Sequence, residues 1–137
     1  MDKRNDLFAA TPPLEAKKLL LSYTVTEGIS YVPGDKEVGI KLDFIDISRA
    51  YFQANAIREV DVELPVDGYE EGMCGKLKKS MHGTRDAAKN WGEEYSKFMI
   101  ESGFRRGKSS PCVFWHPDRE IRCVVHGDDF TVLAWET

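Results

Sequence analysis

The sequence predicts an α+β domain in which an antiparallel sheet is backed by helices. Two stretches with helical spacing of apolar residues alternate with β-rich runs along the chain. Short turn-like segments join several of these runs, and the order is helix, strands, helix, strands. The 137 residues suit one hydrophobic core, so we expect residues 1–137 to form a single domain.

The first helix is predicted to follow Thr11, whose hydroxyl suits an N-cap, with Pro12 at the first helical position. It should run to about Glu27 and stop at Gly28. The apolar residues expected on its buried face are Leu14, Leu21 and Val25.

Extended segments are predicted through the middle of the chain. A turn over Tyr31–Asp35, carrying Pro33 and Gly34, leads into a strand over Val38–Ile47. Two shorter strands are expected on either side of an acidic loop at Asp67–Gly72, and they are Val60–Leu64 and Gly75–Met81.

The second helix should begin near Thr84 and end at Gly103, with a buried side formed by Trp91, Tyr95, Phe98 and Met99. A strand over Pro111–His116, a turn at Pro117–Asp118 and a strand over Ile121–Val125 are predicted to follow.

The adjacent acids Asp128 and Asp129 are the most informative residues. The flanking β-rich runs predict a hairpin with its turn at the Gly127–Asp128 break. Neighbouring carboxylates repel each other unless a cation lies between them, and hard oxygen ligands suit Mg²⁺. Asp46, near the end of its strand, is the candidate third carboxylate. The plain alternative is turn chemistry alone, since Gly and Asp both favour tight turns.

Charge and cysteine content limit the possible functions. The net charge is −4, although basic residues gather in two clusters: Lys76, Lys78, Lys79, Arg85 and Lys89, and then Arg105, Arg106 and Lys108. Three cysteines cannot all pair, which favours a reducing, intracellular setting. Neither a signal peptide nor a membrane-spanning run is predicted.

A zinc site at Cys112, His116, Cys123 and His126 is disfavoured, because strand alternation points Cys123 and His126 to opposite faces. Cys112 and Cys123 are expected to be small buried residues. Alternation likewise places Asp43 and Asp46 on opposite faces of the strand, and the plain reading of Asp43 is a solvated strand residue.

Several segments, in order, resemble the reverse transcriptases of Ty1/copia-type LTR retrotransposons. They are Thr11–Glu15, Asp46–Phe52, Val62–Pro65, Lys76–Gly83, Ala88–Trp91, Gly103–Phe104, Pro111–Phe114 and Gly127–Asp129. The resemblance implies a polymerase palm, with a ferredoxin-like or RRM-like layout, and part of the fingers. It also implies that the thumb and RNase H domain are absent, so the chain alone should have weak activity or none.

The resemblance implies a nucleotidyltransferase, an RNA-directed DNA polymerase, whose catalytic and metal-binding residues are Asp46, Asp128 and Asp129. They would hold two Mg²⁺ ions, with Mn²⁺ as an alternative. Tyr51 would exclude the 2′-hydroxyl of an rNTP, and Arg85 would line the nucleotide pocket. The implied partners are an RNA or DNA template with primer, dNTP and the remaining Pol polyprotein segments. The implied location is cytoplasmic, with virus-like particles left open.

Three residues, at two places in the chain, depart from the family's pattern. Asp86 stands where a Gln is common; as a first-turn residue it suits the helix dipole, and it is assigned no binding role. Arg85 or Lys89 could compensate its charge. His126 and Gly127 replace the Tyr-Val that usually precedes the acid pair, and His126 could contact the primer terminus or be a plain strand residue. Phe52 is expected in the core.

The alternative function is a non-catalytic remnant that binds nucleic acid or protein. A metal-dependent phosphohydrolase ranks last, because no activating base or set of histidine ligands is evident.

Overall fold

The computed structural model describes residues 8–32 and 34–135, and it confirms the α+β class. The chain forms two compact units. One is centred on Arg49–Glu94, and the other combines Ala10–Ser48 with the chain from Tyr95 onward. The prediction of a single domain over residues 1–137 therefore stays a prediction. Among the described residues, no helix has the length and apolar character needed to cross a bilayer.

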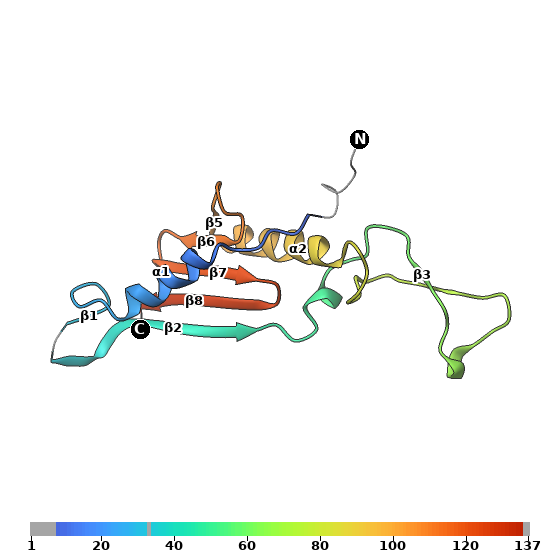
Figure 1. Ribbon diagram of the computed structural model, residues 1–137, viewed down its shortest axis with the longest axis horizontal. Helices are drawn as coiled ribbons and strands as arrows, with labels where there is room; N and C mark the ends of the chain where they lie inside the picture. Colours follow the sequence, from blue (N-terminus) through green and yellow to red (C-terminus); the bar gives the residue numbers. More distant parts are fainter. Residues whose placement is uncertain (1–7, 33, 136–137) are drawn as a thin grey trace. The chain divides into compact units, whose positions relative to one another are not determined.

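A six-stranded antiparallel sheet forms the centre of the second unit (Figure 1). Its order is β1-β2-β8-β7-β6-β5, which places β8 between the long strand β2 and the hairpin partner β7. The strands are β1 (Tyr31–Val32), β2 (Asp35–Asp46), β5 (Arg105–Arg106), β6 (Val113–His116), β7 (Ile121–His126) and β8 (Asp129–Trp135). The predicted hairpin is present. The strand predicted over Val38–Ile47 is also present, but it runs from Asp35 to Asp46. Pro33 of the predicted turn lies outside the described residues.

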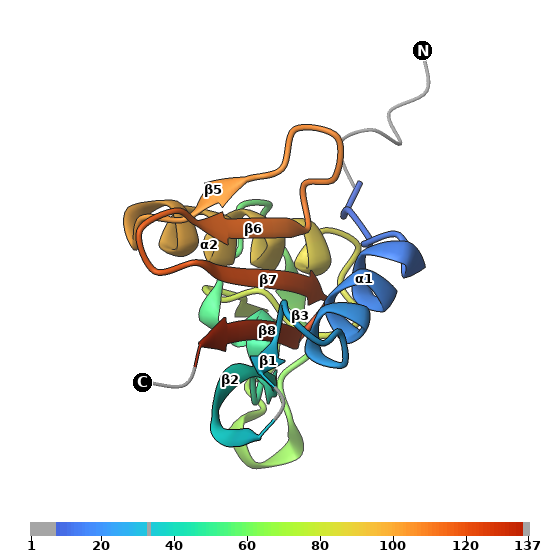
Figure 2. The same cartoon turned by 90° about the vertical axis from the view of Figure 1, so that its left-hand side faces the viewer.

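Helix α1 (Leu14–Thr24) packs on one face of this sheet (Figure 2). Leu20 of the helix, Val124 of β7 and Leu133 of β8 form the buried centre of the contact. Partly buried apolar residues surround them, and these are Ala16, Tyr23, Ile40, Leu42 and Val113. The helix residues that pack on the sheet are therefore Ala16, Leu20 and Tyr23, at positions i, i+4 and i+7.

Two predictions for this helix were wrong. It begins at Leu14, after an extended Pro13, rather than at Pro12, and it ends at Thr24 rather than near Glu27. Beyond this end, the Ser30 hydroxyl lies 2.9 Å from the Thr24 carbonyl and 3.1 Å from that of Thr26, which holds the chain in a turn. The residues expected to be buried are exposed instead: Leu14 (61%), Leu21 (47%) and Val25 (73%). The helix carries two apolar stripes, and only packing against the sheet decides which one is buried.

The opposite face of the sheet is covered by the part of α2 (Ala87–Glu101) that begins at Tyr95. The Tyr95 ring meets Phe114 of β6 and Phe130 of β8 edge-to-face, with centroids 6.0 and 5.6 Å apart. Met99 is also buried, but Phe98 is 66% exposed, so its predicted core position was wrong. The buried stripe repeats every four residues from Trp91 through Tyr95 to Met99, and Phe98 falls to its side.

The ends of α2 follow from local chemistry. Gly103 adopts a φ of 94°, and the amide of Phe104 donates to the carbonyl of Met99, which closes the helix as predicted. The helix begins at Ala87 rather than Thr84, because Thr84–Asp86 forms a turn in which the Thr84 hydroxyl donates to Met81.

The unit centred on Arg49–Glu94 contains little regular structure. Its elements are the 3₁₀ turns η2 (Ala50–Gln53) and η3 (Val66–Gly68) and the paired strands β3 (Asp61–Val62) and β4 (Gly75–Lys76). The strands predicted over Val60–Leu64 and Gly75–Met81 were too long. Beyond β3 and β4, pairing continues through single contacts: the Leu77 N–H donates to the Val60 C=O at 2.9 Å, and Asn55 and Lys79 form an isolated antiparallel bridge.

Phe52 is 46% exposed, so its expected core position was wrong. In the η2 turn the buried positions are taken by the small residues Ala50 and, just after the turn, Ala54.

Candidate metal centre

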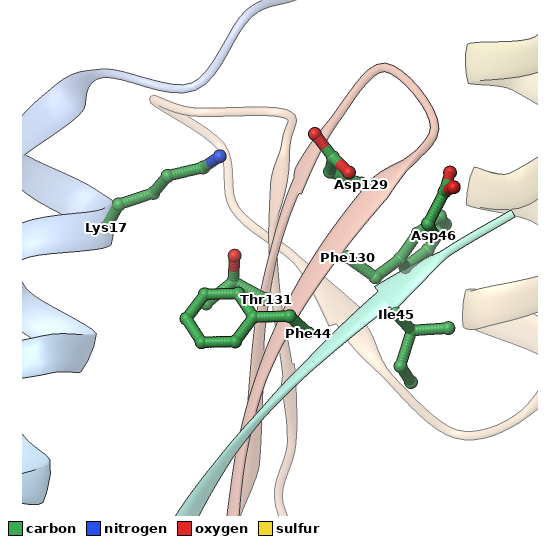
Figure 3. Close-up of a pocket in the computed structure, with 7 residues that line it drawn as sticks. All are labelled: Lys17, Phe44, Ile45, Asp46, Asp129, Phe130 and Thr131. Carbon is green, nitrogen blue, oxygen red and sulfur yellow. The ribbon is translucent and has the colours of Figure 1, made fainter.

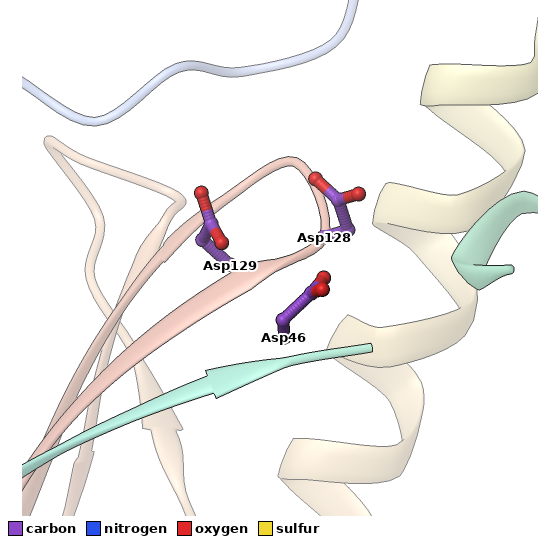
Figure 4. A group of neighbouring side chains, drawn as sticks. All are labelled: Asp46, Asp128 and Asp129. Carbon is purple, nitrogen blue, oxygen red and sulfur yellow. The ribbon is translucent and has the colours of Figure 1, made fainter. Parts of the chain in front are cut away.

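Three carboxylates meet where β2 ends and the β7–β8 hairpin turns (Figure 4). Asp46 is the last residue of β2, and its antiparallel partner is Asp129, the first residue of β8. The Ile47 amide donates to the Asp128 carbonyl at 3.0 Å, which ties the end of β2 to the hairpin turn. Backbone pairing on both sides of the turn therefore fixes the positions from which the carboxylates project.

The turn explains why two adjacent acids can converge. His126 pairs with Asp129, so Gly127 and Asp128 are the two residues of the loop. Gly127 has a φ of 65° whereas Asp128 does not have positive φ, which is the pattern of a type II′ hairpin turn. Because Asp128 lies in the turn, strand alternation does not separate its side chain from that of Asp129.

The convergence predicted from the sequence is present in the structure. Asp46, Asp128 and Asp129 each offer a carboxylate oxygen, and these oxygens lie within 4.8 Å of one another. All three residues are exposed, and none takes part in an ion pair among the described residues. Three like charges at this spacing repel one another and favour a cation in front of them.

The donor set fits magnesium. Mg²⁺–oxygen distances of about 2.1 Å allow two ligands of one ion to be at most roughly 4.2 Å apart. Oxygens that lie within 4.8 Å of one another are close enough for one ion after at most a small side-chain adjustment. The same spacing is compatible with two ions about 3.5–4 Å apart.

A pocket of about 180 Å³ opens beside two of the acids, on the sheet face covered by α1 (Figure 3). Its lining residues are Lys17, Phe44, Ile45, Asp46, Asp129, Phe130 and Thr131. Lys17 extends from α1 toward the acids, and Phe44, two residues before Asp46, is 72% exposed. A cation and an exposed aromatic ring beside carboxylates can receive an anionic group with an apolar or planar part.

Sequence reasoning missed Lys17 and Phe44. The position of Phe44 could have been predicted, because residues two apart on a strand lie on the same face and Phe44 is two residues before Asp46. Lys17 carried none, since its approach to the acids depends on how α1 packs on the sheet.

The other predicted site residues, Tyr51 and Arg85, belong to the unit centred on Arg49–Glu94. Tyr51 is half-buried in η2 and meets the His82 ring edge-to-face at 5.1 Å, while Arg85 is exposed just before α2. Their roles in nucleotide binding stay predictions.

Asp86 has a structural role at the start of α2. Its carbonyl accepts the Asn90 amide at 2.9 Å, and its carboxylate accepts from Arg58 at 3.5 Å and from the Asn90 side chain at 3.2 Å. Asn90 also donates to the Ser80 hydroxyl at 2.9 Å. The cation beside Asp86 is Arg58, rather than Arg85 or Lys89, and Lys89 pairs with Glu93 at 3.8 Å.

The cysteines on the sheet match the prediction of small buried residues. Cys112 and Cys123 are fully buried, and burial raises the pKa of the Cys123 thiol to about 12 and raises that of Cys112. By strand register Cys123 lies on the α2 side of the sheet, whereas His126 lies on the α1 side and is exposed. Asp43 and Asp46 are separated in the same way, as alternation predicts.

Comparison with known proteins finds a sequence similarity to a transposon polyprotein. The chain is 26% identical over 102 residues to the "Retrovirus-related Pol polyprotein from transposon TNT 1-94" of Nicotiana tabacum. The chain is similar to a retrotransposon Pol polyprotein. The match covers 69% of this chain but only 8% of the polyprotein. No family model matches the chain, and no solved structure matches it.

Proposed function

We propose that this chain is the palm region, with part of the fingers, of the RNA-directed DNA polymerase of a copia-like retrotransposon. The observation that carries the proposal is the convergence of carboxylate oxygens from Asp46, Asp128 and Asp129 within 4.8 Å. The similarity to a retrotransposon Pol polyprotein supports the same reading.

Asp46 and Asp128 would be the main metal ligands, with Asp129 completing the set. Bound Mg²⁺ would supply charge neutralisation and activation of the primer 3′-hydroxyl for transfer to the α-phosphorus of a dNTP, with pyrophosphate as the leaving group. The residues of the chain provide the positions. The β2–β8 pairing fixes Asp46 against Asp129, and the Ile47 to Asp128 hydrogen bond fixes the turn.

The pocket beside the acids would hold part of the substrate. Lys17 provides a positive charge on one side for a phosphate, and the exposed Phe44 ring provides a flat apolar surface on which a sugar or base can rest. A template with primer and a dNTP are the substrates that this proposal implies.

Titration of the chain with Mn²⁺, followed by electron paramagnetic resonance, tests the proposal directly. We expect Asp128→Asn to weaken Mn²⁺ binding by at least ten-fold, because it removes one charged ligand from the cluster. Asp43→Asn is the matched control, since it removes the same charge from β2 on the opposite face of the sheet.

Equal Mn²⁺ affinity in the parent and in Asp128→Asn would refute the metal assignment. A non-catalytic remnant of a polymerase would then be the better description of the chain.

A further inference from the structure

A second surface of the sheet combines positive charge with exposed aromatic rings. Arg105 of β5 pairs with Trp115 of β6, and Trp115 pairs with Arg122 of β7, so the three side chains form one row across the sheet. Arg122 pairs in turn with Leu133 of β8, which makes Trp135 its diagonal neighbour on the same face. We call Arg105, Trp115, Arg122 and Trp135 the tryptophan platform.

The two rings of the platform are open to solvent and held in place. Trp115 is 42% exposed and Trp135 is 40% exposed. The Arg105 guanidinium lies 5.7 Å from the centre of the Trp115 ring, and the Trp135 indole N–H donates to Glu120 at 3.1 Å. Rings that are already fixed lose little conformational entropy when a ligand stacks on them.

Arg122 is held between neighbouring groups as well. Its guanidinium lies 5.6 Å from the centre of the Tyr23 ring on α1, and it donates to the Glu120 carbonyl at 3.3 Å. The platform thus presents two arginines whose geometry is set by aromatic and backbone contacts rather than by carboxylates.

The charge of this region contrasts with the rest of the chain. The segment from Ser102 to Val125 holds five of the 19 basic residues but only two of the 23 acidic residues. A basic segment on an acidic protein is complementary to a polyanion, and exposed aromatic faces add base stacking to that attraction.

We propose that the tryptophan platform binds a single-stranded nucleic acid. Two of its bases stack on Trp115 and Trp135, and Arg105 and Arg122 contact the phosphates between them. Trp115 and Trp135 are two strands and two residues apart. With about 4.8 Å between strands and a rise of about 3.3 Å per residue, their backbones lie roughly 12 Å apart. At least one nucleotide therefore lies between the two stacked bases. A single strand fits because its bases are free to stack on side chains, whereas duplex bases stack on each other.

This binding needs no metal and does not use the acidic cluster, so it goes beyond the proposed polymerase chemistry. The test measures fluorescence anisotropy of labelled dT and rU oligomers of about 12 nucleotides with the full chain, in EDTA and at low salt. The two oligomers distinguish DNA from RNA as the preferred strand. We expect both to bind and expect Trp115→Leu to weaken binding about ten-fold, with partial recovery in Trp115→Phe, which keeps an aromatic face.

Arginines on the two faces of β5 provide the matched comparison. Arg105→Gln should weaken binding and lower the slope of log affinity against log salt by about one phosphate contact. Arg106→Gln removes the same charge from the next residue, which points to the other face and lies over Phe114, and it should have little effect.

Three results would overturn the proposal: no binding of either oligomer, equal binding by the parent and Trp115→Leu, or equal losses in Arg105→Gln and Arg106→Gln. The last would indicate diffuse charge attraction. Circular dichroism checks that each variant is folded. Asp43→Asn, on the face of the sheet opposite the platform, should bind the oligomers as the parent does. The assay is run in EDTA and uses no variant of the acidic cluster, so failure of the metal assignment is distinguishable from failure of the platform.

Discussion

Asp46 and Asp129 lie directly opposite each other across the β2–β8 pair. Like charges at such positions destabilise a sheet, so the arrangement is unfavourable for folding in the absence of a cation. We infer that this end of the sheet is built for binding at some expense of stability.

Asp129→Asn should therefore raise the melting temperature of the chain in EDTA by about 1–3 °C, because it removes repulsion with Asp46 and Asp128. In the parent, Mg²⁺ should raise the melting temperature by mass action, and the variant should lose most of this gain. Differential scanning fluorimetry with and without Mg²⁺ measures both effects. A variant less stable than the parent in EDTA would show that the three acids do not repel one another measurably.

Gly127→Ala should destabilise the hairpin by about 1 kcal/mol, because an L-residue is strained at the φ of 65° that the turn requires. An added Cβ would meet no atom within 4 Å, so the loss would come from backbone strain and not from a clash. Gly68→Ala is the control. Its Cβ would also meet nothing within 4 Å and its φ is not positive, so urea unfolding should show no loss of stability.

Arg58→Gln should destabilise the unit centred on Arg49–Glu94 by about 1 kcal/mol, because it leaves the buried Asp86 carboxylate without its cation. The Arg58 side chain is 49% exposed, and solvent screening keeps the effect well below that of a fully buried pair. Lys89→Gln breaks the more exposed pair with Glu93 and should change stability by less than about 0.5 kcal/mol in urea unfolding. Equal losses in the two variants would contradict a structural role for the Arg58–Asp86 pair.

Alkaline pH should unfold the chain. Burial raises the pKa of Cys123 from 9.0 to about 12, and that of Tyr95 from 10.0 to about 12. Above pH 9 the unfolded chain releases these protons before the folded chain does, so stability is complete below pH 9 and falls as the pH rises toward 12.

Urea midpoints measured at pH 8, 9.5 and 11 should decrease in that order. Cys123→Ala removes one of the two strongly shifted groups, so its midpoint should fall less steeply than that of the parent. An identical pH dependence would exclude Cys123 as a source of the effect.

The sequence contained most of the candidate site because its residues are placed by local rules. A Gly-Asp break between two β-rich runs specifies a two-residue turn, which put Asp128 and Asp129 at a hairpin tip. The position of Asp46 followed from the prediction of one long strand with this residue near its end. The pairing of β2 with β8, which brings the third acid to the other two, is a long-range contact, and the family resemblance rather than local pattern predicted it.

The failures share a physical cause. Helix α1 carries two apolar stripes. One consists of Ala16, Leu20 and Tyr23, and the other consists of Leu14, Leu21 and, just after the helix, Val25. The sequence pattern does not say which stripe meets the sheet. The partner of Asp86 was missed for a similar reason, since Arg58 is 28 residues away in sequence whereas Arg85 and Lys89 are neighbours. Contacts between distant segments are set by tertiary packing, which local spacing does not encode.

Strand β8 has a hydrogen-bonded neighbour along each of its edges, β2 on one side and β7 on the other. Such a strand opens only together with its neighbours, so its amide protons should exchange slowly with deuterium. In the proposed metal centre, the backbone that carries Asp129 should therefore stay in place, and only side-chain torsions need to adjust. Ion uptake and release should consequently be rapid and should leave the amide exchange pattern along the middle of β8 almost unchanged.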